Sequence, residues 1–355
     1  MDTNPQTQFL LMEVAKLKGE NQRLRAYIGN NNLPQPPFRM PFAGEGDAPS
    51  PDSILSHCYG ALLPMFTTKE ATVLRQLCKE FRSTVADFPW EDDQTVIRGS
   101  VAAWRACFPR ARWANVMGYR ADFQEEGRMT PVVDSDFVHF VGLKRLNMSE
   151  CRSITDAAFV HLKGIHTLDM YACSQDTITD AAIAHLKGIH TLKIASCGQL
   201  TDAAFIHLEG IHSLDMSWCN ELTDAAFVHL QGIHTLVMAE CDQPTITDAA
   251  FVHLKGVHTL RMDYCKQPTI TDAAFVHLRG IHSLGLYYCR QLTSAVLTHL
   301  KGVKRLNIGH CTQLNLTDDS LKGIEWLGMQ FHSQAQVDEA ESFGYPVDQR
   351  YYIHV

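Results

Sequence analysis

Thiols are the first side chains in this sequence whose spacing could serve chemistry, because eight of the eleven cysteines recur at intervals of 22 or 24 residues. The recurring set is Cys151, Cys173, Cys197, Cys219, Cys241, Cys265, Cys289 and Cys311. A zinc or iron–sulfur site needs two or more ligands converging within one short motif such as Cys-x-x-Cys. No such motif occurs in the chain. We therefore expect small, buried thiols, with no metal and no cofactor.

Imidazoles form two further series with the same period. One series falls in predicted helices: His139, His161, His185, His207, His229, His253, His277 and His299. The other precedes predicted strands: His166, His190, His212, His234, His258 and His282. If the units stack, neighbours within a series lie about 5 Å apart. Such a series could act as a metal ladder or a pH switch; alternatively, one ancestral unit carried both histidines and was copied.

The elements that position these side chains follow from a single unit, residues 155–173, which is repeated with small changes along the chain. Leu168 and Met170 alternate with a polar residue, the period-two pattern of a strand with one buried face. Thr155 can cap a short helix, and Gly164 can end that helix in the left-handed conformation. The two-residue difference in length always follows the cysteine, which indicates a loop on a solenoid.

The unit Ile165-x-x-Leu168-x-Met170-x-x-Cys173 matches the pattern Leu-x-x-Leu-x-Leu-x-x-Cys. With cysteine in the ninth position and Thr-Asp following, residues 137–329 resemble the cysteine-containing subclass of leucine-rich-repeat proteins. The resemblance implies an α/β solenoid, a right-handed horseshoe with a parallel β-sheet on its concave face.

The two ends of the array are atypical, as terminal repeats of a solenoid must be when one flank meets solvent. We expect the repeats to span 131–332. Residues 333–355 lose the pattern and are typical of a C-terminal cap. At the other end, residues 112–116 are predicted to form a degenerate strand that caps the sheet.

Three columns of side chains at and after each predicted strand differ from unit to unit, and the resemblance places them on the concave face. Diverse charged and aromatic side chains on a rigid frame are typical of a protein-binding surface. Drift at exposed positions is the alternative. The candidate partner-binding residues are Asp169, Tyr171, Trp218, Glu240, Arg261, Asp263, Tyr264, Tyr287 and Tyr288.

A heptad pattern occupies residues 1–33, with leucine at one apolar position and Val, Asn and Ile at the other, which favours two parallel helices. The candidate dimerisation residues are Leu10, Val14, Leu17, Asn21, Leu24 and Ile28. Three heptads are marginal alone, so this segment forms either a homodimeric coiled coil or one exposed amphipathic helix. Residues 34–50 contain proline and glycine and little that could pack, which is typical of a linker.

A small helical domain is predicted over residues 51–130. Apolar residues between Leu74 and Val85 recur at helical spacing, and Thr67 or Thr68 can cap that helix. A proline-led first helix, then Leu74-x-x-Leu-Cys-Lys-x-Phe-Arg and a Pro-Trp end, resembles an F-box. The resemblance implies docking of a Skp-type adaptor of a cullin–RING ligase by Pro51, Ile54, Leu55, Leu62, Leu63, Phe66 and Leu74.

Composition and charge argue against several classes of function. Lys plus Arg number 31 against 39 Asp plus Glu, a net charge of −8, which argues against a broad nucleic-acid surface. No run approaches the roughly 18 apolar residues that a membrane helix requires. The charged N-terminal segment is unlike a secretory leader. We therefore expect a reduced, intracellular protein, in the cytoplasm or the nucleus.

The sequence contains no Gly-x-Ser-x-Gly, phosphate-binding glycine loop or His-Glu-x-x-His motif, so we expect no enzyme. The two resemblances together imply the substrate-recognition subunit of a cullin–RING (SCF-type) ubiquitin ligase. Such a subunit would hold an unknown protein substrate on its concave face. The alternative is a leucine-rich-repeat scaffold or recognition protein without a ligase role, in which the helical head is only a cap.

Overall fold

The computed structural model describes residues 63, 67–77, 79–92, 94–118, 131–315 and 322–328. The chain divides into two compact units, residues 1–86 and residues 87–355, and each is considered by itself. In these described ranges no helix is long and apolar enough to cross a membrane. The predicted heptad segment, linker and C-terminal cap all lie outside the described residues.

Two helices make up most of the described part of the first unit: α3 (Thr68–Leu77) and α4 (Lys79–Asp87), whose last residue crosses the boundary. The sequence predicts one helical stripe here, and α3 begins at one of the two predicted caps. Residue 78, between the helices, lies outside the described residues. Ala71 and Val85 are buried, so each helix has a packed side.

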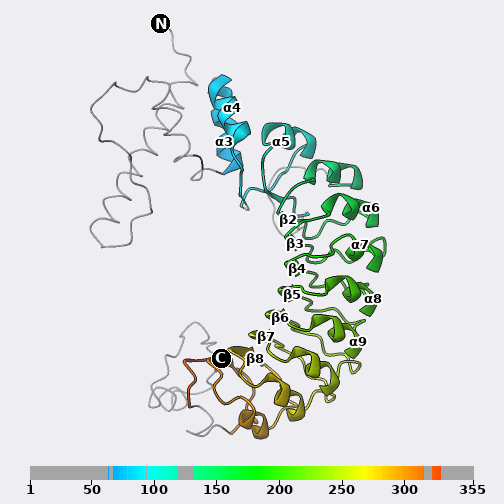
Figure 1. The fold of residues 1–355 in the computed structure, drawn as a ribbon, viewed down its shortest axis with the longest axis vertical. Coiled ribbons are helices and arrows are strands. Elements are labelled where there is room, and N and C mark those ends of the chain that lie inside the picture. Colours follow the sequence, from blue (N-terminus) through cyan, green and yellow to red (C-terminus); the bar gives the residue numbers. More distant parts are fainter. Residues whose placement is uncertain are drawn as a thin grey trace, which may run out of the picture. The chain divides into compact units, whose positions relative to one another are not determined.

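A ten-strand parallel sheet forms the second unit, with its strands in chain order (Figure 1). Each strand has three residues: β1 (Trp113–Asn115), β2 (Arg145–Asn147), β3 (Thr167–Asp169), β4 (Thr191–Lys193), β5 (Ser213–Asp215), β6 (Thr235–Val237), β7 (Thr259–Arg261), β8 (Ser283–Gly285), β9 (Arg305–Asn307) and β10 (Trp326–Gly328). Leu168 pairs with Leu146 on one side and with Leu192 on the other, as predicted. The degenerate strand β1 is also confirmed, because it pairs with β2.

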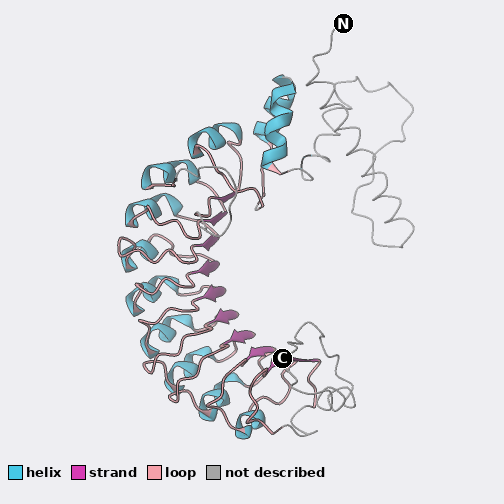
Figure 2. Ribbon diagram, turned by 180° about the vertical axis from the view of Figure 1, so that it is seen from behind, coloured by secondary structure: helices cyan, strands magenta, loops and turns pink. Residues whose placement is uncertain are grey.

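Short helical turns connect the strands and lie on the outer side of the curved array, while the strands lie on its inner side (Figure 2). The α-helical turns are α5 (Val101–Cys107), α6 (Asp156–Phe159), α7 (Asp180–Ala184), α8 (Asp202–Phe205) and α9 (Asp224–Phe227). The 3-10 turns are η2 (Asp134–Phe140), η3 (Val160–Leu162), η4 (Ile206–Leu208), η5 (Val228–Leu230), η6 (Asp248–Leu254), η7 (Asp272–Leu278) and η8 (Ser294–Thr298).

From α6 to η8, a threonine at the start of the helical turn of each repeat couples that turn to the preceding repeat. The Thr155 hydroxyl accepts a hydrogen bond from the Ala157 N–H at 3.2 Å, which is the predicted cap. The same hydroxyl donates to the Asp134 carboxylate, one repeat back, at 2.7 Å, and the Thr155 N–H donates to that carboxylate at 2.8 Å. Equivalent pairs recur at every boundary up to Thr293 and Asp272. Charge-assisted bonds of this kind are the stronger ones.

The core is one continuous cluster of buried side chains that runs through all the repeats from Ile97 to Leu327. In the repeat of β3, Phe159, Leu168 and Cys173 are fully buried, so the helical turn, the strand and the following loop all contribute. Gly164 ends the helical turn with φ of +79°, the left-handed conformation that the sequence predicts. The concave face therefore rests on a packed, regular frame.

Candidate partner-binding face

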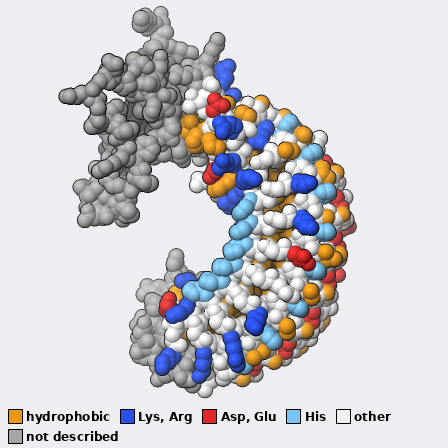
Figure 3. All heavy atoms as spheres, viewed as in Figure 1, with side chains coloured by type: hydrophobic (Ala, Val, Ile, Leu, Met, Phe, Trp, Pro, Cys, Tyr) orange, Lys and Arg blue, Asp and Glu red, His pale blue; other side chains and the backbone are white. Residues whose placement is uncertain are grey.

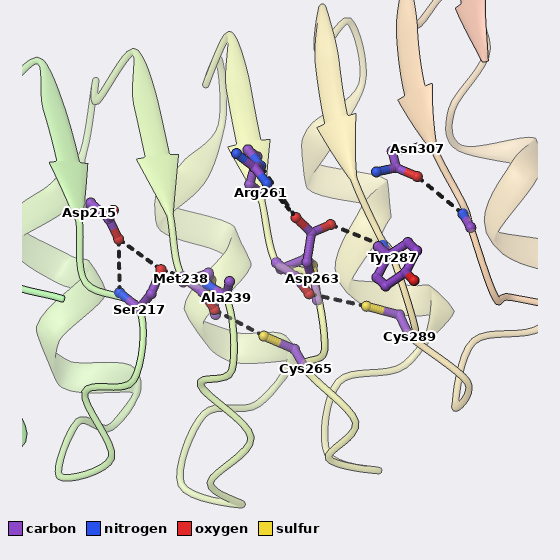
Figure 4. Close-up of polar contacts among 12 residues, drawn as sticks. Asp215, Ser217, Met238, Ala239, Arg261, Asp263, Cys265, Tyr287, Cys289 and Asn307 are labelled. Carbon is purple, nitrogen blue, oxygen red and sulfur yellow. Dashed lines mark hydrogen bonds and ion pairs between the residues drawn. The ribbon is translucent and has the colours of Figure 1, made fainter. Parts of the chain in front are cut away.

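The eight repeat cysteines are buried and act as donors between repeats. The Cys265 thiol donates to the carbonyl of Met238, one repeat back, at 3.0 Å (Figure 4). The Cys173 thiol likewise donates to the carbonyl of Met148 at 3.2 Å. Burial raises the pKa of the Cys173 thiol to about 12, so this thiol is protonated at neutral pH. The sequence predicts the burial of these thiols but not their hydrogen bonds to the neighbouring repeat.

A glutamine series also joins the repeats, and it is not among the site residues predicted from the sequence. The Gln267 amide nitrogen donates to the Cys241 carbonyl at 2.9 Å, and that of Gln243 donates to the Cys219 carbonyl at 3.0 Å. The signal was present, because glutamine stands two residues after six of the eight repeat cysteines. These bonds satisfy carbonyls in the loops that leave the sheet.

The column immediately before the cysteines has the left-handed backbone conformation. φ is +62° at Trp218, +59° at Glu240 and +63° at both Tyr264 and Tyr288. An L-residue costs roughly 1–2 kcal/mol in this conformation. Because all eight units adopt it, the strain belongs to the turn that each repeat requires after its strand. This turn directs large side chains away from the core at the edge of the sheet.

The candidate Asp169 has a structural role in addition to its place on the concave face. Its Oδ1 accepts the N–H of Tyr171 at 3.2 Å and the hydroxyl of Ser149 at 3.0 Å. Its Oδ2 lies 3.1 Å from the Lys193 Nζ, so the charge of this carboxylate is partly neutralised. Tyr171 itself is 38% exposed and is available to a partner.

Asp263 is buried, in contrast to its prediction as a partner-binding residue on an exposed column. Only 6% of Asp263 is accessible. Its Oδ2 accepts from the Arg261 guanidinium at 3.0 Å, and its Oδ1 accepts the N–H of Tyr287 at 3.0 Å (Figure 4). Asp263 therefore positions its two neighbours, and Arg261 remains exposed.

Three of the candidate tyrosines form one cluster with His310 at the C-terminal end of the concave face. Tyr264 and Tyr288 stack with their centroids 5.1 Å apart, and Tyr288 continues onto His310 at 4.3 Å. Tyr287 meets Tyr264 edge-on at 5.2 Å. Burial, followed by a hydrogen bond with Tyr264, raises the pKa of Tyr287 to about 12. The turns that follow β7 and β8 thus bring the three tyrosine rings together.

Two cations border this tyrosine cluster. The Arg290 guanidinium lies 4.4 Å from the centre of the Tyr288 ring, and the Lys266 Nζ lies 5.2 Å from the centre of the Tyr264 ring. Within the described part of the chain, neither cation pairs with an acid. The cluster is therefore aromatic and positively charged, although the whole chain carries a net charge of −8.

Two further candidates on the concave face, Trp218 and Glu240, follow strands that come before β7 and β8 in the sheet. Trp218, after β5, is 51% exposed, which is unusual for a large apolar ring. Glu240 follows β6 and is half-buried. The concave face therefore carries aromatic side chains along its length and gathers them most closely near β7 and β8.

The other predicted site residues fall mostly outside the described residues. Of the adaptor-binding set, Leu63 is described and buried, and Leu74 lies in α3 without a described side chain. Pro51, Ile54, Leu55, Leu62 and Phe66 lie outside the description, as do the dimerisation residues Leu10, Val14, Leu17, Asn21, Leu24 and Ile28.

The pre-strand histidines, His166, His190, His212, His234, His258 and His282, form one stack of rings, here called the histidine stack. Neighbouring centroids are 4.4–4.5 Å apart, and neighbouring planes are inclined by 12–23°. Figure 3 shows the stack as a continuous row of pale-blue side chains along the inner edge of the array. The predicted spacing of about 5 Å is therefore confirmed for this series.

No protein-family model and no curated protein matches the sequence. Among solved structures, a chain of the Toll–Spatzle complex of Drosophila matches with a TM-score of 0.47 and 12% identity, over 66% of this chain and 38% of that one. A chain of the Rad7–Elc1 complex of yeast matches with a TM-score of 0.44 and 12% identity, over 100% of this chain and 97% of that one.

The leucine-rich-repeat protein LegL7 of Legionella pneumophila matches with a TM-score of 0.46 and 13% identity, over 68% of this chain and 92% of that one. At these identities the likeness concerns the course of the backbone alone. The repeat architecture of this chain follows from its own ten-strand parallel sheet and its 22–24-residue period, which make it an α/β leucine-rich-repeat solenoid.

Proposed function

We propose that this protein is a non-enzymatic recognition protein that binds a partner protein on the concave face of its solenoid. The observation that carries the proposal is the tyrosine cluster of Tyr264, Tyr287 and Tyr288 with its bordering cations Lys266 and Arg290. Tyrosine, tryptophan and arginine dominate the binding energy of protein interfaces. Their side chains offer much contact area for little loss of conformational freedom.

The charge of the cluster indicates what kind of segment it would hold. Asp263 is the acid beside the tyrosines, and it is engaged by Arg261 and by the backbone of Tyr287. Among the described residues no acid pairs with Lys266 or Arg290, so the positive charges of these two side chains face a partner bound at the cluster. A partner segment with acidic side chains next to apolar or aromatic ones would match both the charge and the rings.

The more specific proposal is a substrate-recognition subunit of a cullin–RING ubiquitin ligase. Its support is the F-box-like order of residues in the N-terminal part, together with the cysteine-containing repeats that follow. The division into two compact units is compatible with a head that docks an adaptor and a solenoid that holds the substrate. The ligase would then act on a substrate kept at high effective concentration.

The partner-binding proposal is tested with the full chain as bait and the triple variant Y264A/Y287A/Y288A. We expect the wild type to retain a specific partner protein that the variant loses. The matched control is V160A/I206A/V228A, which shortens three exposed side chains on the outer helical turns, where their exposure is 47%, 54% and 45%. Equal retention by both variants would contradict a concave binding site.

The ligase proposal is tested separately, by mixing the full chain with a purified Skp-type adaptor and measuring the mass of the complex by light scattering. We expect a one-to-one complex that is lost when residues 51–66 are deleted and kept in Y264A/Y287A/Y288A. A chain that binds its concave partner but never the adaptor would be the scaffold alternative, with the helical head serving only as a cap.

A further inference from the structure

The histidine stack is a solvent-facing array that partner recognition by the tyrosine cluster does not use. The five rings from His166 to His258 are exposed, and only His282 is half-buried. Six imidazoles from consecutive repeats thus present their edges along one line, 4.4–4.5 Å from ring to ring. Neutral imidazole nitrogen is a common ligand of zinc, copper and nickel ions.

In four of the six rings a threonine hydroxyl holds one nitrogen and leaves the other for a ligand. The Nδ1 of His190 lies 3.1 Å from the Thr191 Oγ1, and that of His234 lies 3.2 Å from the Thr235 Oγ1. The same contact recurs at His166 and His258. When Nδ1 donates to the hydroxyl oxygen, the lone pair resides on Nε2. Metal-binding histidines typically show this arrangement, in which the second nitrogen donates to an oxygen acceptor.

We propose that adjacent rings of the histidine stack bind divalent transition-metal ions, each ion being held by the Nε2 atoms of two neighbouring histidines. Nitrogen binds zinc at about 2.0–2.1 Å, so two nitrogens on one ion lie about 3–4 Å apart. The rings already stand 4.4–4.5 Å apart. The rings are nearly parallel, so two neighbouring rings must tilt toward each other for both Nε2 lone pairs to meet one ion. The rings from His166 to His258 are exposed, and such a tilt does not require the core to move.

Each such site is open, because the protein supplies two ligands. In the described part of the chain no three His, Cys, Asp or Glu side chains are grouped to hold an ion. Water, or a donor atom of a partner, would occupy the remaining positions. The six rings provide about three pairs when all are used.

The histidine stack ends at a lysine on each side. The His166 N–H donates to the Lys144 carbonyl at 3.0 Å, and the Lys304 N–H donates to the His282 carbonyl at 3.0 Å. The adjacent imidazoles that can share an ion therefore end at His166 and at His282.

The helix series of histidines provides an internal comparison. Its rings contact other side chains: the Nδ1 of His229 lies 3.2 Å from a Glu209 carboxylate oxygen, and that of His253 lies 3.4 Å from the Gln231 amide nitrogen. No ring-to-ring stacking joins members of this series among the described residues. The two series have the same period and differ in whether neighbouring rings meet.

The experiment measures binding of Ni²⁺ and Zn²⁺ to the full chain, without an affinity tag, by isothermal titration calorimetry, with Mg²⁺ as the inert ion. Two variants each remove three histidines of the stack. H190Q/H234Q/H282Q leaves no two adjacent rings, whereas H166Q/H190Q/H212Q leaves three rings in a row. The helix-series variant H207Q/H229Q/H253Q is the control for total histidine content.

We expect wild type and the helix-series variant to bind Ni²⁺ alike, and the variant with three rings in a row to keep the affinity with fewer ions per chain. The alternating variant should lose affinity about tenfold or more, because each ion would then have one imidazole instead of two. Equal affinities for the two stack variants would overturn the proposal, since binding would then follow histidine number. Absence of Ni²⁺ and Zn²⁺ binding by the wild type would overturn it outright. Circular dichroism verifies that each variant is folded.

Discussion

The ring of Tyr287 lies directly over the backbone of Gly309 in the next repeat. A Cβ atom at position 309 would stand 2.6 Å from the Tyr287 Cδ2, closer than two carbon atoms can approach. The absence of a side chain at this position thus makes room for the ring that contacts Tyr264 and His310. A glycine on the concave face therefore shapes the tyrosine cluster.

Changing Gly309→Ala should displace the Tyr287 ring and destabilise the fold by about 1–3 kcal/mol, as overpacking typically does. The measurement is the urea midpoint of the single variants G309A and Y287A and of the double variant. In the double variant the ring is absent, so the added methyl group should cost much less. Strictly additive effects of the two substitutions would show that residues 287 and 309 do not contact each other.

The energetic cost of a side chain in the left-handed conformation at position 164 can be measured without any steric clash. A Cβ atom there would meet no atom within 4 Å, and φ is +79°. Gly164→Ala should therefore cost about 1–2 kcal/mol from backbone conformation alone. Gly198→Ala is the control, because that glycine also has open space but no positive φ. A similar loss of thermal stability at both positions would argue against backbone strain as the cause.

The buried thiols should not react with thiol reagents in the folded protein. Burial raises the pKa of the thiols of Cys173 and Cys241 to about 12, and burial raises that of Cys219 well above its usual value. The thiolate is the reactive form. We expect the eight repeat cysteines to react with a disulfide reagent at pH 8 only after addition of urea. Fast labelling of these eight cysteines in buffer, located by mass spectrometry, would contradict this burial.

Acid should weaken the fold through the histidine stack. Desolvation and neighbouring rings lower the pKa of His190 and His258 in the folded state. The unfolded chain then binds more protons as the pH falls through the unfolded value near 6.5, so the stability is present above this pH and declines below it. We expect the urea midpoint to fall between about pH 7.5 and 5.5 in the wild type.

The control replaces all six rings of the stack by glutamine, which cannot titrate. Its midpoint should change less over the same pH range than that of the wild type. Parallel pH profiles for the two proteins would show that protonation of these exposed rings costs no stability, and a midpoint that rises on acidification would reverse the sign of the prediction.

The regular part of the fold could be predicted from the sequence because each unit repeats the same local signals. The cap at Thr155, the left-handed turn at Gly164 and the buried column that includes Cys173 all follow from a period of 22–24 residues. The same period predicts the spacing between neighbouring histidines of the stack. The stacking of their rings depends on side-chain rotation, which the spacing does not determine.

The concave face was harder to predict, because its contacts join residues of neighbouring repeats. The column pattern predicts an exposed Asp263, but Arg261 and the backbone of Tyr287 enclose this carboxylate. Gly285 contributes to this arrangement, since a Cβ atom there would stand 2.9 Å from the Asp263 Oδ1. Whether one carboxylate is exposed therefore depends on residues 22–24 positions away, and a column of single positions does not contain that information.

The bonds between repeats have one further consequence, for how such an array can change its length. At each boundary the same threonine hydroxyl meets the same aspartate, and the same thiol meets the same carbonyl. Removal or duplication of a whole unit by unequal recombination would join one copy of this interface to another and leave the fold intact. The number of copies is then free to vary, and the order of the side chains on the concave face changes in a single genetic event.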